Sequence, residues 1–170
     1  MSNSDNLNSP SSRVPYADPL VEQQAVKVKT PCIGVCSTGI GGEVCRGCKR
    51  FIHEIAGWNG YDNTAKSHVI NRISVLLVQV VQSRISIRDV SKLEAGLKAY
   101  DIRYQPSADP HAWVLDLLKA GASQLDSLSA FGCEIKSSSK KLSLPELRDV
   151  IDEDFYTLSE AHYERYFDTK

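Results

Sequence analysis

Four cysteines within seventeen residues constrain this chain more than any other feature. They are Cys32, Cys36, Cys45 and Cys48, with the spacing Cys-x3-Cys-x8-Cys-x2-Cys. A Cys-x2-Cys step lets two thiolates converge on one ion, and Gly47 inside the step allows a tight turn. In a reducing compartment, thiols clustered this closely are ligands more often than disulfides. The spacing therefore predicts a metal site with these four cysteines as its ligands.

The spacing leaves two kinds of metal centre open. Two sequence-local cysteine pairs suit a structural zinc ion bound by four thiolates. An iron–sulfur cluster also takes four cysteines, although this spacing matches neither the bacterial nor the plant ferredoxin pattern. Spacing alone favours zinc slightly.

Three cations, Arg46, Lys49 and Arg50, lie beside the last two cysteines. Four thiolates around a divalent ion or a 2+ cluster leave a net charge of about −2, which nearby cations stabilise. We therefore favour charge compensation as their role, with contact to nucleic acid as the alternative. Glu54 and Trp58 follow Arg50 at one-turn steps, which predicts an ion pair and a core aromatic on one helix face.

The segment around these residues resembles a known family. The runs TPCIGVC (30–36), CRGCKR (45–50) and EIAGW (54–58) are similar to domain-of-unknown-function family 1289, a group of small bacterial proteins described as predicted Fe–S proteins. The resemblance covers about residues 30–84. It implies that the four cysteines bind metal, and it implies no reaction. The resemblance also favours an iron–sulfur cluster, so that zinc and a cluster are close to equally supported as the metal centre.

The rest of the pattern predicts a mainly helical protein. Apolar residues at three- and four-residue steps indicate a short helix ending near Gly57 and a long helix that follows a cap at residues 62–64. Capping residues and apolar spacing predict further helices over residues 89–99, 110–121, 123–132 and 144–167, the last with a capping box at Ser143 and Glu146 and a break possible at Thr157.

Between these helices the pattern predicts irregular segments. Residues 102–104 are expected to form a short strand or an extended turn, and residues 136–141 a solvated loop. Cys133 is typical of a small core residue. The acidic residues Asp149, Asp152, Glu153 and Asp154 are typical of a solvated helix face.

Composition divides the chain into three predicted parts. Residues 1–29 are mostly polar and contain three prolines, which predicts a mobile tail. Residues 30–84 form the predicted four-cysteine module with its following helices, and residues 85–170 form a predicted helical C-terminal domain. The net charge is +3 over residues 1–90 and −4 over residues 91–170, which suggests two units with different surfaces.

No stretch is long and apolar enough to span a bilayer, and the first twenty residues lack the apolar run of a signal peptide, so we expect a cytoplasmic protein without a membrane partner. No phosphate loop or nucleophile elbow is present, which favours a non-enzymatic role. The leading hypothesis is a metal-binding adaptor that engages a protein partner.

Two other functions stay open. The first is an Fe–S protein that transfers electrons or senses redox state or oxygen. The second is nucleic-acid or ribosome-associated binding through six cations: Arg46, Lys49, Arg50, Arg72, Arg84 and Arg88.

Overall fold

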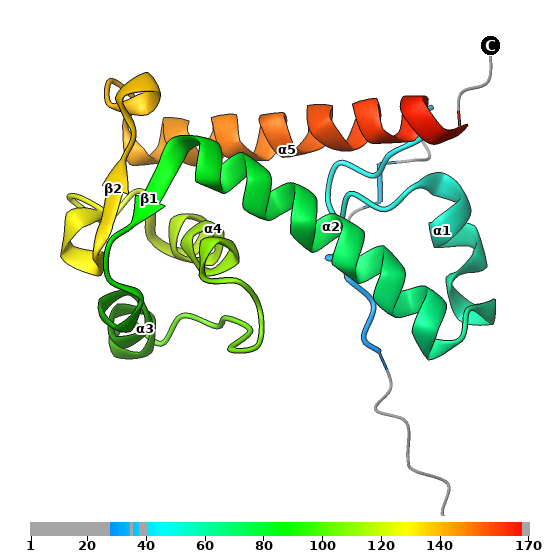
Figure 1. The fold of residues 1–170 in the computed structure, drawn as a ribbon, viewed down its shortest axis with the longest axis horizontal. Helices are drawn as coiled ribbons and strands as arrows, with labels where there is room; N and C mark the ends of the chain where they lie inside the picture. Colours follow the sequence, from blue (N-terminus) through cyan, green and yellow to red (C-terminus); the bar gives the residue numbers. More distant parts are fainter. Residues whose placement is uncertain (1–27, 35, 38–40, 168–170) are drawn as a thin grey trace, which may run out of the picture.

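The computed structural model describes residues 28–34, 36–37 and 41–167, so the predicted tail over residues 1–29 lies almost entirely outside the described residues. Within them the chain is mainly helical, as predicted (Figure 1). The α-helices are α1 (Ile52–Gly57), α2 (Asn63–Arg84), α3 (Val90–Ala99), α4 (Pro110–Gly121) and α5 (Leu144–Phe167). Two strands, β1 (Ile85–Ile87) and β2 (Cys133–Ile135), and three short 3-10 helices, η2 (Trp58–Gly60), η3 (Ser129–Phe131) and η4 (Ser137–Ser139), complete the fold.

Capping residues fix where four of these helices begin. The carboxylates of Asp62, Asp89 and Asp109 each accept a hydrogen bond from a backbone N–H in the first turn of α2, α3 and α4. At the start of α5, Ser143 N donates to Glu146 Oε2 at 2.8 Å and Glu146 N donates back to Ser143 Oγ at 3.4 Å. The predicted capping box is therefore confirmed.

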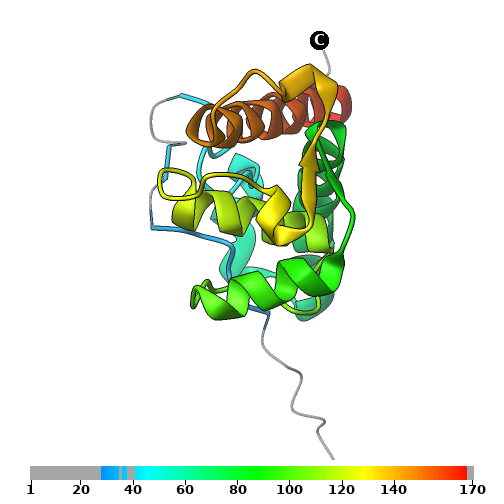
Figure 2. The ribbon, with the colours of Figure 1, turned by 90° about the vertical axis from the view of Figure 1, so that its left-hand side faces the viewer.

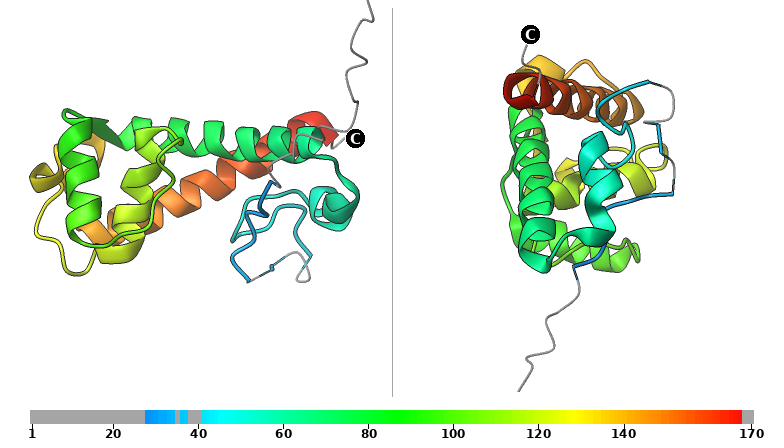
Figure 3. Two further views of the ribbon diagram at one scale, coloured as in Figure 1. Left: turned by 90° about the horizontal axis from the view of Figure 1, so that it is seen from below. Right: turned by 90° about the vertical axis from the view of Figure 1, so that its right-hand side faces the viewer.

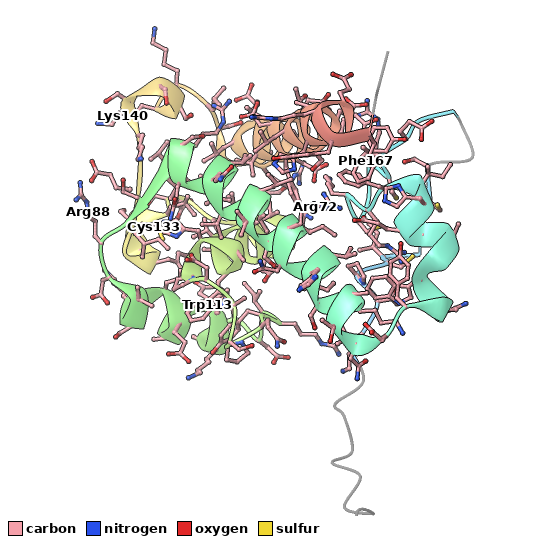
Figure 4. The ribbon with its side chains drawn as sticks, turned by 45° about the vertical axis from the view of Figure 1, so that its right-hand side comes forward. Arg72, Arg88, Trp113, Cys133, Lys140 and Phe167 are labelled. Carbon is pink, nitrogen blue, oxygen red and sulfur yellow. The ribbon has the colours of Figure 1, made fainter. Side chains whose placement is uncertain are left out.

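The main apolar core lies where α2, α4 and α5 pack against one another (Figure 1). Figure 4 shows Trp113 and Cys133 within this part of the molecule. The fully buried members include Val81, Leu93, Leu97, Leu117, Leu118, Leu147 and Ile151. The C-terminal half of α2 thus shares one core with the residues after it. The predicted boundary at residue 84 runs through this core, and the separate unfolding of two units stays a prediction.

A two-stranded antiparallel sheet closes the end of the molecule that faces the viewer in Figure 2. Strand β1 continues directly from α2, and Ile85 lies opposite Ile135 while Ile87 lies opposite Cys133. The sequence analysis predicts neither strand, because three residues are too few to show a period of two. Residues 102–104, one candidate for a strand, are irregular instead.

Three other predicted details differ from the structure. Residues 123–128 form turns rather than a helix, and the helical part is confined to η3. The segment 136–141 is not wholly solvated, because Ser139 is buried and its Oγ lies 3.0 Å from Arg84 Nη1. Helix α5 runs through Thr157 without a break.

The N-terminal module, defined here as residues 28–60, lies beside the first turns of α2 and the last turns of α5 (Figure 3). Its apolar cluster is small: Val44 and Phe51 are buried together with Tyr156 of α5, and Tyr163 packs against them. The module therefore sits at the edge of the protein, outside the main core.

Gly96 offers a test of the core packing. A Cβ at this position in α3 would lie 2.3 Å from Cδ1 and 2.7 Å from Cε1 of the buried Phe131 ring. We expect Gly96→Ala to lower the free energy of unfolding by about 1–3 kcal/mol, although alanine is the better helix former. Gly60→Ala is the control, because a Cβ there meets no atom within 4 Å. Urea unfolding measures both variants, and equal stabilities would contradict the packing.

Candidate metal centre

Cys45 and Cys48 lie in a tight hairpin turn over residues 44–51, whose two end residues form an antiparallel bridge. Cys45 N donates to Arg50 O at 2.9 Å, and Lys49 N donates to Cys45 O at 2.8 Å. Lys49 takes the left-handed conformation, with φ 59°, that lets the chain reverse after Cys48. The turn buries both cysteines, and each sulfur affects the pKa of the other.

The sulfur atoms of this turn receive hydrogen bonds that favour thiolate. Burial raises the pKa of Cys45, but hydrogen bonds from the backbone of Cys48, Ser37 and Gly47 outweigh it and lower that pKa to about 6. Arg50 Nε donates to Cys48 Sγ at 3.3 Å, although burial still raises the pKa of Cys48. One stabilised thiolate beside a second thiol is the arrangement that a thiophilic metal binds.

The other two cysteines lie on the exposed loop that approaches this turn. Gly34 N donates to Cys32 Sγ at 3.4 Å. Ser37, the residue after Cys36, accepts a hydrogen bond from Arg46 N on its Oγ at 2.7 Å, and its backbone also reaches the Cys45 sulfur. Val35 and residues 38–40 lie outside the described residues. The loop therefore places Cys36 next to the turn through Ser37.

The structure brings the four predicted ligands together in part. In the part of the chain that the structure describes, no group of three or more His, Cys, Asp or Glu side chains is arranged to hold a metal ion. None of the five cysteines forms a disulfide in the described structure. The donor set still fits a four-thiolate centre, because backbone or guanidinium N–H groups already point at the sulfur atoms of Cys32, Cys45 and Cys48.

Two of the neighbouring cations connect the turn to α5. The Lys49 side chain is 1% exposed, and its Nζ donates to Asp152 Oδ1 at 2.7 Å and to the carbonyl of Arg46. Arg46 Nη1 pairs with Glu153 Oε2 at 3.1 Å. Asp152 and Glu153 keep exposed side chains, as predicted for a solvated helix face, and they are in addition partners of the cysteine turn.

Glu54 pairs with a different arginine from the one predicted. Its Oε2 accepts a hydrogen bond from Arg72 Nη2 of α2 at 2.8 Å and another from Phe51 N at 2.8 Å. The Arg72 guanidinium also donates to Lys49 O at 3.2 Å and lies 3.7 Å from the centroid of the Phe51 ring. Figure 4 shows Arg72 between α2, the end of α5 and the module. Its Nε and Nη1 are buried and have no hydrogen-bond partner in the described structure.

Arg50 instead turns toward the cysteines and Trp58. Its guanidinium lies 4.9 Å from the centroid of the Trp58 ring, in addition to its contact with Cys48. Trp58 is buried, as predicted for a core aromatic. The predicted ion pair fails because Arg72 of α2 occupies the carboxylate of Glu54, and sequence spacing within one helix gives no sign of a partner on another.

The six cations considered for nucleic-acid binding are mostly neutralised within the protein. Besides the pairs already described, Arg84 Nε lies 2.6 Å from Asp154 Oδ2 and Arg88 Nη2 lies 2.9 Å from Glu134 Oε2. Five of the six thus have a carboxylate partner, and the sixth, Arg50, is buried. Phosphate binding depends on cations that are free to replace counterions, so the five paired cations form a weaker basic surface than their number suggests.

One segment of the chain, which contains the candidate site, is similar to a known protein family. Residues 30–76 match the family described as "Protein of unknown function (DUF1289)". The match includes all four cysteines and the first two-thirds of α2, which confirms the resemblance over this part of the chain. No curated protein and no solved structure matches the chain. None of the helices that the structure describes is long and apolar enough to cross a membrane.

The link between the turn and α5 can be tested at Asp152. Asp152→Asn leaves the buried ammonium of Lys49 without a negatively charged partner, and we expect a loss of about 2 kcal/mol in the free energy of unfolding. Asp149→Asn removes the same charge from an exposed position paired with Arg148, and its effect should stay within about 0.5 kcal/mol. Urea unfolding compares the two, and equal losses would assign the effect to net charge alone.

The lowered pKa of Cys45 gives a pH dependence with a defined sign. Its thiolate contributes stability that is fully present above the unfolded pKa of about 8.5 and is lost as the pH falls through about 6. Thiolate absorbance of metal-free protein should therefore rise near pH 6, and this rise should be missing in Cys45→Ala. Cys133→Ala is the matched control, because burial raises the pKa of Cys133 to about 11. A rise that survives in Cys45→Ala would refute the assignment.

Proposed function

We propose that this chain is a non-enzymatic metal-binding adaptor in which Cys32, Cys36, Cys45 and Cys48 hold one metal centre. The observation that carries the proposal is the hairpin turn over residues 44–51, where backbone groups and the Arg50 guanidinium hydrogen-bond the thiol sulfurs. These donors stabilise thiolate, the form in which cysteine binds metal, and they orient the ligands.

The small apolar cluster of the module supports a structural role for the metal. Among the described residues, Val44 and Phe51 reach the cluster with Tyr156, whereas the main core lies among the long helices. A segment with so little buried apolar surface generally needs a metal or disulfides to fold. Because a four-thiolate site forms together with the fold, the free energy of metal binding would be folding free energy.

Zinc is the first candidate for the metal. A tetrahedral ion suits two sequence-local cysteine pairs, and the turn already holds one pair of thiols together. An iron–sulfur cluster is the second candidate, and it is favoured by the resemblance to a family described as Fe–S proteins. In that case the N–H···S contacts at Cys32 and Cys48 would tune the cluster's reduction potential, and the function would be electron transfer or redox sensing.

A protein partner is the best match to the surface near the module. Ile52 is 39% exposed, Tyr166 is 61% exposed and Phe167 is 50% exposed. Phe167 also contacts Phe51, with ring centroids 5.5 Å apart, so Ile52 and the end of α5 lie close together. Exposed apolar side chains that gather in this way are typical of protein contact sites. The neutralised cations described above make nucleic acid the weaker alternative.

The test is metal content in protein purified without oxygen. We expect about one zinc ion per chain, which is colourless, or the iron and sulfide of one cluster, which is brown. Cys48→Ser should lose the metal, whereas Cys133→Ser removes an equally buried thiol outside the site and should keep it. Elemental analysis that finds neither metal in the wild type would contradict the proposal. Loss of metal from Cys133→Ser would show that the ligand assignment is wrong.

A further inference from the structure

A cavity of about 790 Å³ lies between the segment 28–30, α1 with η2, and the first turns of α2. Its described lining contains no carboxylate. The residues that define its chemistry are three cations and three apolar side chains: Lys29, Arg50, Lys66, Val28, Ile55 and Trp58.

The cations around this cavity differ from the others in this half of the chain. Residues 28–84 contain seven lysines and arginines. Four of them form ion pairs with carboxylates and lie outside the cavity: Arg46, Lys49, Arg72 and Arg84. The other three, Lys29, Arg50 and Lys66, form no ion pair with any described carboxylate, and all three line the cavity. Unpaired positive charge is therefore gathered at one place.

Among these three cations Arg50 is the most informative, because its side chain is buried and only 4% of the residue is exposed to solvent. Its Nε donates to Cys48 Sγ, while its two terminal nitrogens make no hydrogen bond within the described structure. Its guanidinium and Lys66 Nζ lie 4.9 Å and 5.9 Å from the centroid of the same Trp58 ring. Both cations lie near one ring, and the described lining of the cavity contains no carboxylate, so an anion in the cavity would offset their charge.

We propose that this cavity binds the phosphoryl group of a small phosphate monoester. A dianionic phosphate matches three cations better than a single carboxylate does, and its oxygens accept hydrogen bonds from both guanidinium and ammonium groups. The apolar wall formed by Val28, Ile55 and Trp58 suits a small apolar body attached to the phosphate. The volume falls within the range of about 300–1,000 Å³ for small-molecule sites. The cavity adjoins the proposed metal centre through Arg50, but phosphate binding does not depend on metal binding.

The experiment is isothermal titration calorimetry of the full, metal-loaded chain with phenyl phosphate, inorganic phosphate and benzoate. Phenyl phosphate should bind the wild type with one site per chain. Lys29→Gln and Lys66→Gln should each weaken binding about tenfold, which corresponds to the loss of one charge-assisted hydrogen bond. Lys141→Gln removes the same charge from an exposed residue outside the cavity and should leave the affinity unchanged. Arg50 is left intact because it also contacts Cys48.

Each outcome has a definite meaning. Tighter binding of phenyl phosphate than of inorganic phosphate supports a monoester, and equal binding supports recognition of the phosphoryl group from free phosphate. The proposal is overturned if neither phosphate binds the wild type at millimolar concentration, if benzoate binds as tightly as phenyl phosphate, or if Lys141→Gln weakens binding as much as Lys66→Gln. Far-UV circular dichroism and metal content verify each variant. Lys29 lies outside any helix, so its variant keeps the test valid if Lys66→Gln perturbs α2.

Discussion

The buried ammonium of Lys49 is the contact on which the position of the cysteine turn depends. A lysine that is 1% exposed is tolerated only when its charge is paired, and Asp152 of α5 supplies the partner at 2.7 Å. The backbone of the same residue accepts a hydrogen bond from Arg72 of α2. Both long helices therefore hold Lys49, and the turn with Cys45 and Cys48 is positioned by the whole fold rather than by a core of its own.

This arrangement explains how a small module and a larger helical core form one structure. Helix α2 contributes Leu76, Val80 and Val81 to the main core at one end, and Arg72 to the module nearer its start. Different positions along one helix therefore serve different neighbours. The proposed metal centre thus lies at the edge of the protein, apart from the main apolar core.

Local signals in the sequence predicted much of this fold. Helices α2 to α5 are capped by Asp62, Asp89, Asp109 and Ser143, because a side-chain oxygen at each position accepts a hydrogen bond from an N–H of the first turn. Such caps can be recognised from the sequence alone. The pairing of β1 with β2 could not be predicted from the sequence, because the two three-residue strands are far apart in the chain.

The same limit applies to the candidate site. The spacing of the cysteines identified Cys32, Cys36, Cys45 and Cys48 as candidate metal ligands. The Cys-x2-Cys step predicted the tight turn that holds Cys45 and Cys48. The partners of that turn were missed because Lys49 and Asp152 are 103 residues apart, and no spacing rule connects residues on different helices. For Glu54 the helix rule pointed to Arg50, but a guanidinium from α2 reaches the carboxylate instead.

The unequal charge of the two halves has a structural meaning that differs from the predicted one. Residues 1–90 carry the net positive charge and residues 91–170 the net negative charge, which suggested two units with different surfaces. Four ion pairs instead join a cation of the first half to a carboxylate of the second: Arg46–Glu153, Lys49–Asp152, Arg84–Asp154 and Arg88–Glu134. Much of the opposite charge of the two halves is therefore neutralised in ion pairs that join them. Among the described residues near the module, the cations without a carboxylate partner are Lys29, Arg50 and Lys66, so an anionic ligand has one favoured place to bind there.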